Sequence, residues 1–364
     1  MKITSLLILA FLFSFSKDHN KNVEKQFIYK GRLEVINKDH VKLIGSASSI
    51  TFNFSGNECA LYLKSEDSYE HHNYISLELD GKYMGRIKIE KGETKTYPIE
   101  ISEKSKAHQL TIYKATEAAN GVVSFLGTTA KIINQKTKKS NPKKIEFIGN
   151  SITCGMGNDT QEIPCGTGEW YDQHNAYWAY GPILSRSLNV DFLLSSVSGI
   201  GMYRNWNDEN IEESIMPDVY ENLYLNKENP KPYDFNFKPD IISICLGTND
   251  LSEGDGKKAR LPFNEEKYIN NYINFIKMIY QHHPKVQIAL LTSPMVSGEK
   301  NKILVNCLNK IIASFENDKK HKKIALFEYQ PMIPKGCGYH PDIEDHKIMA
   351  AQLEPFFKKL IHEK

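Results

Sequence analysis

The sequence predicts two domains of different class: an antiparallel β-sandwich, followed by a three-layer α/β/α domain built on a parallel sheet. Residues from about 24 to 135 contain strand patterns and no persistent helical period. From Ile145 onward strands alternate with helices, which is typical of parallel sheets covered on both faces. The polar segment "NQKTKKSNPKK", which contains Pro142, separates the two patterns. We therefore divide the chain into an N-terminal processing segment (1–16), the sandwich (17–138), a linker (139–144) and the α/β domain (145–364).

Strand signals dominate the first half. In "ITFNF", Ile50, Phe52 and Phe54 alternate with polar residues and so share one face. In "YISLELDGKYMGRIKI", the pair Asp80-Gly81 separates two strand-like runs, a strong signal for a β-hairpin. "HQLTIYKA" and "GVVSFLG" supply further strands. An antiparallel sandwich is the expected result.

The second half combines buried strands with amphipathic helices. "DIISICLG" and "VQIALLTS" are continuous apolar runs, as strands covered on both faces should be. "YINNYINFIKMIY" places apolar residues at helical spacing, and "AYWAYGPILSRSL" and "KIMAAQLEPFFKKL" are expected to be further helices. In parallel sheets of this kind, ligands bind beyond the carboxyl ends of the strands.

Composition and the N-terminal segment limit the classes of function. Of the 364 residues, 40% are apolar and 25% charged, and the net charge of +2 favours neither a nucleic acid nor an anionic membrane as partner. "MKITSLLILAFLFSFS" has a basic start, an apolar run and a small-x-small end, which is typical of a signal peptide. The run is shorter than the roughly 20 residues that span a bilayer. We therefore expect export to the periplasm or medium, with a buried N-terminal helix as the alternative. The oligomeric state stays open.

Six cysteines follow this segment, and an exported chain permits disulfides. Cys154 and Cys165 lie close together in glycine-rich sequence and are the pair we expect to be bonded. Cys245 lies inside the apolar run "IISICL" and is expected to be a core residue. The cysteine spacings do not resemble a zinc site.

Four segments end in small or polar residues where the carboxyl edge of the sheet is expected. "IEFIGNSITCGMG" presents Ser151, "VDFLLSSVSGIG" presents Gly199, and "IISICLGTND" presents Asn249. "PKGCGYHPD" places His340 before the last helix. Each segment alone could be an ordinary turn, but together they supply the parts of an acyl-transfer site.

The chemistry assigns a role to each part. A serine hydroxyl needs a base within hydrogen-bond reach, so Ser151 is the candidate nucleophile and His340 its base. The tetrahedral intermediate needs donors for its oxyanion: the N–H groups of Ser151 and Gly199 and the side-chain amide of Asn249. Gly201 is the alternative to Gly199. Losing one such donor typically raises the barrier by about 3 kcal/mol.

These four blocks, "GNSIT", "SGIG", "GTND" and "YHP" in this order, resemble those of the SGNH hydrolases, also called GDSL-type esterases. "NAYWAYGPILSRSL", "MPDVYENLY", "KPDIISICLGTNDLSEGD" and "KATEAANGVVSFLG" resemble carbohydrate esterase family two, a group of exported deacetylases. The resemblance implies a jelly-roll sandwich before a flavodoxin-like SGNH domain. It also implies removal of O-acetyl groups from polysaccharides such as xylan or mannan, with no metal or other cofactor. Asn150 stands where many relatives carry aspartate, at a position without a catalytic role.

One departure from the SGNH pattern concerns the base. Many relatives carry an aspartate two or three positions before the histidine, where this chain has Gly338 and Cys337. Asp342 and Asp345 come after His340. We therefore predict a Ser–His dyad whose imidazole N–H is accepted by a backbone carbonyl.

Aromatic residues after the first block are candidates for sugar binding. Trp170, in the glycine-rich loop "GEWYDQ", is a candidate for stacking against a sugar of the substrate. Tyr177 and Trp178 belong to a predicted helix and are expected to lie in the core. The predicted function is a secreted serine esterase that deacetylates polysaccharides through an acetyl-serine intermediate. The alternatives are a non-catalytic carbohydrate-binding protein on the same scaffold, or an esterase for acylated lipids or acetylated cell-wall glycans.

Overall fold

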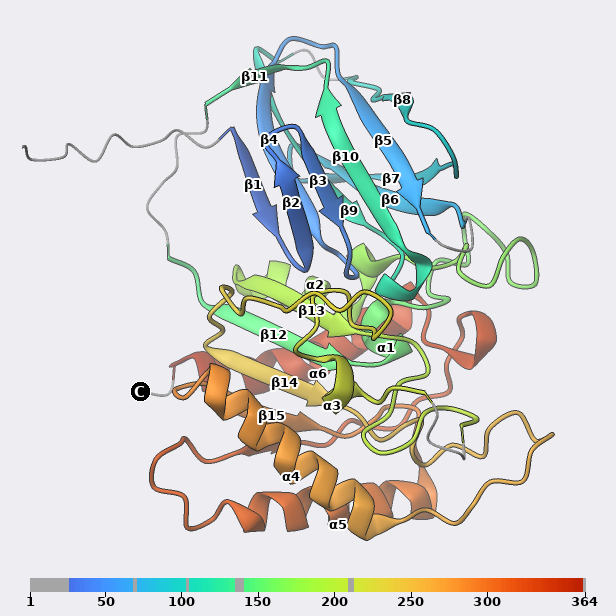
Figure 1. Cartoon of the computed structure of the whole chain (residues 1–364), viewed down its shortest axis with the longest axis vertical. Helices are drawn as coiled ribbons and strands as arrows, with labels where there is room; N and C mark the ends of the chain where they lie inside the picture. Colours follow the sequence, from blue (N-terminus) through green and yellow to red (C-terminus); the bar gives the residue numbers. More distant parts are fainter. Residues whose placement is uncertain (1–25, 68–70, 103–104, 135–140, 209–212, 363–364) are drawn as a thin grey trace, which may run out of the picture.

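The structure is a computed structural model, and it describes residues 26–67, 71–102, 105–134, 141–208 and 213–362. The predicted signal peptide (1–16) and the predicted domain boundary at 138–139 lie outside these residues. Figure 1 shows the two domains stacked along the long axis of the molecule, with the sandwich above the α/β domain. Within the described ranges, no helix combines the length and apolar character needed to cross a membrane.

The first domain consists of two antiparallel sheets. One contains, in spatial order, β1 (Phe27–Lys30), β4 (Ser49–Ser55), β9 (Ala107–Lys114), β6 (Asn73–Leu79) and β7 (Lys82–Ile89), with β11 (Lys131–Ile133) also paired to β4. The other contains β2 (Leu33–Asn37), β3 (His40–Leu43), β10 (Val122–Thr128), β5 (Ala60–Glu66) and β8 (Lys95–Pro98).

The predicted strand faces are confirmed in this domain. Ile50, Phe52 and Phe54 are all fully buried in the core between the sheets. Asp80 and Gly81 both have positive φ, 51° and 78°, as a tight two-residue hairpin turn between β6 and β7 requires.

The second domain has a five-stranded parallel sheet, so the predicted fold class is confirmed. The strand order is β13 (Asp191–Ser196), β12 (Lys144–Gly149), β14 (Ile241–Cys245), β15 (Gln287–Leu291) and β16 (Ala325–Phe327). The helices are α1 (Ser151–Cys154), α2 (Tyr180–Leu188), α3 (Met216–Val219), α4 (Glu265–His282), α5 (Gly298–Ser314) and α6 (Ile343–His362). The described residues also form short 3₁₀ turns: η1 (Ala118–Asn120) in the sandwich, and η2 (Ala176–Trp178) and η3 (Cys337–Tyr339) in the second domain.

Alternate residues of the buried strands face two separate cores. On β15, Ile288 and Leu290 pack with residues of α4 and α5, whereas Ala289 and Leu291 pack with residues of α2 and α6. This arrangement gives the three layers. The single helix predicted for "AYWAYGPILSRSL" is two elements, η2 and α2, because Ala179 between them has an extended backbone.

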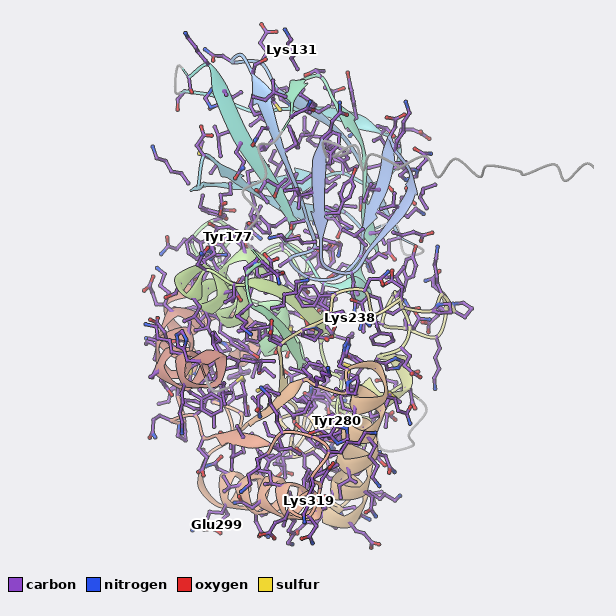
Figure 2. All side chains as sticks on the ribbon, turned by 90° about the vertical axis from the view of Figure 1, so that its left-hand side faces the viewer. Lys131, Tyr177, Lys238, Tyr280, Glu299 and Lys319 are labelled. Carbon is purple, nitrogen blue, oxygen red and sulfur yellow. A yellow bond between two sulfur atoms is a disulfide. The ribbon has the colours of Figure 1, made fainter. Side chains whose placement is uncertain are left out.

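Buried polar contacts join the two domains. Figure 2 shows Tyr177 at the level where the domains meet, between Lys131 near one end of the molecule and Glu299 near the other. The Tyr177 hydroxyl donates to Glu78 Oε2 at 2.8 Å, and its ring stacks on that of Tyr83. Tyr177 therefore packs against the sandwich and belongs to the interface between the domains.

The strand order reverses at β12, which has β13 on one side and β14 on the other. In parallel α/β sheets, the crevice beyond the carboxyl ends of the strands at such a reversal is the usual ligand site. The segments that follow β12, β13 and β14 contain Ser151, Gly199 and Asn249.

Candidate active site

Ser151 is the first residue of α1 and comes directly after the short turn that ends β12. The side chain of Asn150 caps this helix by accepting the N–H of Ile152 at 3.2 Å. At Gly149, a Cβ atom would lie 2.0 Å from Thr153 Oγ1, so the turn from strand to helix requires glycine there. The tight turn presents Ser151 at the carboxyl edge of the sheet.

His340, which follows η3, lies next to Ser151. Its Nε2 is 2.7 Å from Ser151 Oγ, and its Nδ1 is 2.7 Å from the carbonyl oxygen of Gly338. A carbonyl oxygen can only accept, so Nδ1 carries the hydrogen of the neutral imidazole. Nε2 is then the acceptor for the Ser151 hydroxyl, which is the arrangement that a general base needs.

The two aspartates after His340 have a structural role. Asp345 N–H donates to Asp342 Oδ1 at 2.8 Å, and Asp342 N–H donates to Asp345 Oδ2 at 3.2 Å, a reciprocal cap at the start of α6. Asp345 also accepts the N–H of Lys335. Among the described residues, the hydrogen-bond acceptor for the imidazole is therefore the Gly338 carbonyl.

The structure distinguishes Gly199 from Gly201. Gly199 has a φ of +76° and lines the cavity above Ser151, and a Cβ built on it meets nothing within 4 Å. Backbone conformation, rather than space, therefore requires glycine at this position. The N–H of Gly201 donates to Asn205 Oδ1, and a Cβ on Gly201 would lie 1.9 Å from the Arg204 carbonyl oxygen. Gly201 thus serves the packing of the loop.

Asn249 is buried in the turn that follows β14 and lines the same cavity. Its Nδ2 donates to the Ile200 carbonyl at 2.8 Å. Because an amide nitrogen carries two hydrogens, one remains for a ligand. The neighbouring Asp250 accepts the N–H groups of Met202 and Tyr203 at 3.0 and 2.9 Å, which fixes the loop after β13.

Burial lowers the pKa of His340 below its ordinary value, because the charged imidazolium loses hydration. The hydrogen bond to Gly338 and the charge of Glu117 act in the opposite direction, and His174 adds to the lowering. The imidazole is therefore neutral, and available as a base, at neutral pH.

Two family models match the chain. The model described as carbohydrate esterase 2 N-terminal matches residues 29–136, and the model of the GDSL-like lipase/acylhydrolase family matches residues 147–327. An acetylxylan esterase/glucomannan deacetylase of Cellvibrio japonicus is 28% identical over 301 residues, which are 80% of this chain and 78% of that protein. A family two carbohydrate esterase from Clostridium thermocellum, solved with cellohexaose, superposes with a TM-score of 0.79 at 26% identity and covers 92% of this chain and 99% of that one.

The chain belongs to carbohydrate esterase family 2. It is therefore a carboxylic ester hydrolase, and the resemblance drawn from its sequence blocks is confirmed. An acetyl xylan esterase, Est2A, from the rumen bacterium Butyrivibrio proteoclasticus shares the fold, with a TM-score of 0.76 at 22% identity over 92% of this chain and 96% of that one.

The cavity of this family 2 esterase has a volume of about 900 Å³ and is lined by Ser151, Gly199, Asn249 and His340 together with other residues. Trp206, which is 46% exposed, also lines it. Trp170 does not line it: the Trp170 ring is 48% exposed and packs edge-on against Tyr171 and His174. The structure thus brings four of the five predicted site residues together, and substrate contact by Trp170 stays a prediction.

The predicted pairing of Cys154 with Cys165 is wrong. Cys165 is bonded to Cys337, across 172 residues of sequence, and ties the loop that carries His340 to the loop after α1. Cys154 is a free thiol, fully buried on α1, and its Sγ lies 3.3 Å from Ser196 Oγ and 3.4 Å from Glu117 Oε2. Closeness in sequence misled the prediction, because α1 turns Cys154 away from the loop of Cys165.

Sequence reasoning missed Trp206 and the disulfide to Cys337. Trp206 lies seven residues after Gly199, in the segment "SGIGMYRNW". Its closeness in sequence to the predicted oxyanion glycine was the signal that could have identified it. No group of three or more His, Cys, Asp or Glu residues with metal-site geometry occurs in the part of the chain that the structure describes.

Proposed function

We propose that this family 2 esterase removes O-acetyl groups from a polysaccharide through an acetyl-serine intermediate on Ser151. The observation that carries the proposal is the chain of two short contacts, from Ser151 Oγ to His340 Nε2 and from His340 Nδ1 to the Gly338 carbonyl oxygen, both 2.7 Å. These two contacts join a nucleophile, a base and the acceptor that orients the base.

In the first half-reaction, Ser151 Oγ attacks the acetyl carbonyl carbon while His340 Nε2 takes the hydroxyl proton. The resulting oxyanion accepts hydrogen bonds from the N–H groups of Ser151 and Gly199 and from the free amide hydrogen of Asn249. The intermediate then collapses. The bond from carbon to the sugar oxygen breaks, and the imidazolium returns its proton to that oxygen, so the sugar leaves as an alcohol.

In the second half-reaction, water replaces the sugar alcohol. His340 removes a proton from water as the hydroxide attacks the acetyl-serine carbon, and the same donors bind the second oxyanion. The bond from the acetyl carbon to Ser151 Oγ then breaks, and the imidazolium returns its proton to Oγ. Acetic acid leaves and ionises to acetate in solution. The Gly338 carbonyl holds the tautomer throughout, and it stabilises the imidazolium less than a carboxylate would.

The character of the cavity supports a glycan substrate. Trp206 presents an exposed ring on which a sugar can stack, and Asp255, Ser252 and Lys300 provide polar groups for sugar hydroxyls. The similar proteins named above include an acetylxylan esterase/glucomannan deacetylase and an esterase crystallised with cellohexaose. We therefore propose xylan- or mannan-type acetyl esters as substrates.

We also propose that the protein is exported, on the basis of the N-terminal segment. The disulfide between Cys165 and Cys337 supports this, since such bonds persist in oxidising compartments. Sequencing the N-terminus of the mature protein tests it: a start soon after residue 16 is expected, and retention of Met1 would contradict export.

The esterase proposal is tested with wild-type protein and Ser151→Ala. Both are assayed on 4-nitrophenyl acetate, on a longer-chain 4-nitrophenyl ester and on acetylated xylan and glucomannan, with released acetate measured. We expect activity that favours the acetyl esters and is lost in the variant. Equal turnover by the two proteins would refute the esterase mechanism, and preference for the longer chain would refute the deacetylase assignment. Glycan binding without turnover by wild-type protein would favour the non-catalytic alternative.

A further inference from the structure

One buried carboxylate of the sandwich domain reaches the active site of the other domain. Glu117 lies between β9 and η1 and is 0% exposed. In Figure 1 the nearby start of β10 lies at the end of the sandwich that faces α1. Burying a charged group is costly unless partners compensate it, so its contacts indicate a role.

The Glu117 carboxylate contacts two segments that hold catalytic parts. Oε2 accepts the N–H of Ser198 at 2.6 Å, and Ser198 directly precedes the proposed oxyanion donor Gly199. Oε2 also accepts the thiol of Cys154 at 3.4 Å, three residues after Ser151 on α1. A single side chain of the sandwich thus connects the nucleophile helix with the oxyanion loop.

Charged and polar groups from several neighbouring segments lie around Glu117. His174 Nε2, from the segment before η2, lies 3.4 Å from Oε1. Lys114, at the end of β9, donates from Nζ to the main-chain carbonyl of Glu117, and Asp67 adds a further carboxylate near that lysine. Burial raises the pKa of Glu117, but its contacts with His174 and Ser198 outweigh this and lower the pKa below its ordinary value. Glu117 is therefore ionised at neutral pH.

The loop after β13 is held at two points by carboxylates from different domains. Glu117 holds its start at Ser198, and Asp250 of the α/β domain holds the N–H groups of Met202 and Tyr203. Gly199 lies between these points with a φ of +76° and has no side chain of its own to fix its orientation. Its carbonyl accepts the N–H of Trp206 at 2.8 Å, and the direction of its own N–H depends on how the preceding residue, Ser198, is held.

We propose that Glu117 is a positioning residue through which the sandwich domain completes the esterase site, by anchoring Ser198 so that the Gly199 N–H faces the reacting carbonyl. The inference rests on the proposed function, since it needs Gly199 as an oxyanion donor. It implies that the sandwich is required for turnover as well as for the walls of the cavity.

The charge of Glu117 acts on the pKa of His340, so the pH profile of kcat/KM can distinguish the proposed role from a purely structural one. This charge raises the pKa of His340, whereas burial and His174 lower it. Removing the charge lowers the pKa of His340 further. The imidazole then stays neutral to more acidic pH, so the acid limb of the kcat/KM profile moves to lower pH.

The test compares Glu117→Gln and Glu117→Ala with a matched control, Glu146→Gln. Glu146 is also a fully buried carboxylate, held by Ser195 Oγ at 2.7 Å and the Tyr220 hydroxyl at 3.0 Å, but it does not line the cavity. Steady-state kinetics on 4-nitrophenyl acetate are measured across pH, and thermal unfolding is measured for each protein.

For Glu117→Ala we expect kcat to fall about 100-fold, close to the loss of one oxyanion donor, with KM within about threefold. For Glu117→Gln, which keeps an acceptor for Ser198, we expect a smaller loss of kcat and a shift of the acid limb to lower pH. Glu146→Gln lowers stability but leaves the acid limb in place. Should Glu117→Gln not fold, Glu117→Asp is measured instead, with a lowered kcat as the expected result.

The outcomes separate this inference from the proposed function. An inactive Ser151→Ala together with wild-type kcat and pH profile in Glu117→Gln or Glu117→Asp would overturn the role of Glu117 alone. A loss in Glu117→Gln equal to that in Glu146→Gln, with an unmoved acid limb, would overturn it too. Full activity in Ser151→Ala would instead remove the proposed function on which the inference rests.

Discussion

Replacing Asn249 by alanine tests the two roles of its side-chain amide, because each of the two amide hydrogens has a different partner. One is committed to the Ile200 carbonyl at 2.8 Å, inside the protein, and the other is available to a ligand in the cavity. The substitution removes both. It should therefore affect the stability of the fold and the transition state of the reaction by separate amounts.

The two amounts can be worked out from the contacts. The Ile200 carbonyl loses its side-chain donor, which costs about 1–3 kcal/mol of unfolding free energy if it stays buried without a new partner. The oxyanion loses one donor, which costs about 3–4 kcal/mol in the barrier, or about 100- to 1,000-fold in kcat. Because the ground-state ester carries no full negative charge, KM should change by less than about threefold.

The assay needs a variant that loses a similar structural contact without touching the cavity. Asn271→Ala provides it, since Asn271 Nδ2 donates to the Met202 carbonyl at 3.1 Å, in the same loop. Both variants and wild-type protein are compared on 4-nitrophenyl acetate and by thermal unfolding. We expect a similar loss of stability in both variants, and a large fall in kcat only in Asn249→Ala.

Two results would refute this reasoning. A kcat for Asn249→Ala within about threefold of wild type would show that the amide does not bind the oxyanion. An equal fall in kcat in Asn271→Ala would show that loop stability, rather than a donated hydrogen bond, controls the rate.

Three further predictions concern the base and its loop. Asp342→Ala removes a helix cap, so about 1 kcal/mol of stability should be lost while kcat stays within a few-fold of wild type; a thousand-fold loss of kcat would show that this carboxylate orients the imidazole. The acid limb of kcat/KM should have its midpoint below about 6.5, because burial lowers the pKa of His340 and only the neutral imidazole is a base; a midpoint above that value would contradict the assignment. Cys337→Ser, which removes the bond to Cys165, should lower stability by about 2–5 kcal/mol and lower kcat as the loop of His340 loosens. Unchanged thermal unfolding of that variant would mean that the bond does not constrain the fold.

Local patterns predicted the fold class, and they predicted that four candidate site residues meet at one edge of the sheet, where they line one cavity. The alternation in "ITFNF" and the Asp80-Gly81 pair predicted buried faces and a hairpin that the structure contains. The site could be predicted because β12, β13 and β14 are parallel, so the segments that follow them must meet at one edge of the sheet. The order and direction of the strands were therefore enough to predict that these residues lie close together in space.

The remaining features depend on contacts that topology alone does not determine. Cys165 pairs with Cys337, from a loop 172 residues away, rather than with the nearby Cys154. Trp206 lines the cavity, whereas Trp170 packs on His174. Such outcomes depend on how loops fold back on the domain, and no periodic pattern encodes that.

Glu117 illustrates a further limit. It belongs to the sandwich, whose strand pattern carries no sign of catalysis, and it reaches Ser198 only because the two domains pack against each other. Neither domain taken alone would indicate its role. Orientation of His340 by a backbone carbonyl was expected from the missing aspartate, and the structure contains such a contact, to the Gly338 carbonyl at 2.7 Å.

Trapping the covalent intermediate tests the central claim most directly. Wild-type enzyme is mixed with excess 4-nitrophenyl acetate, quenched in acid within the first turnovers, digested and analysed by mass spectrometry. We predict one acetyl group on the peptide that contains Ser151, at the Ser151 side chain, and none in Ser151→Ala treated in the same way. Steady release of acetate with the acetyl group on another residue, or with Ser151→Ala as active as wild type, would contradict the account.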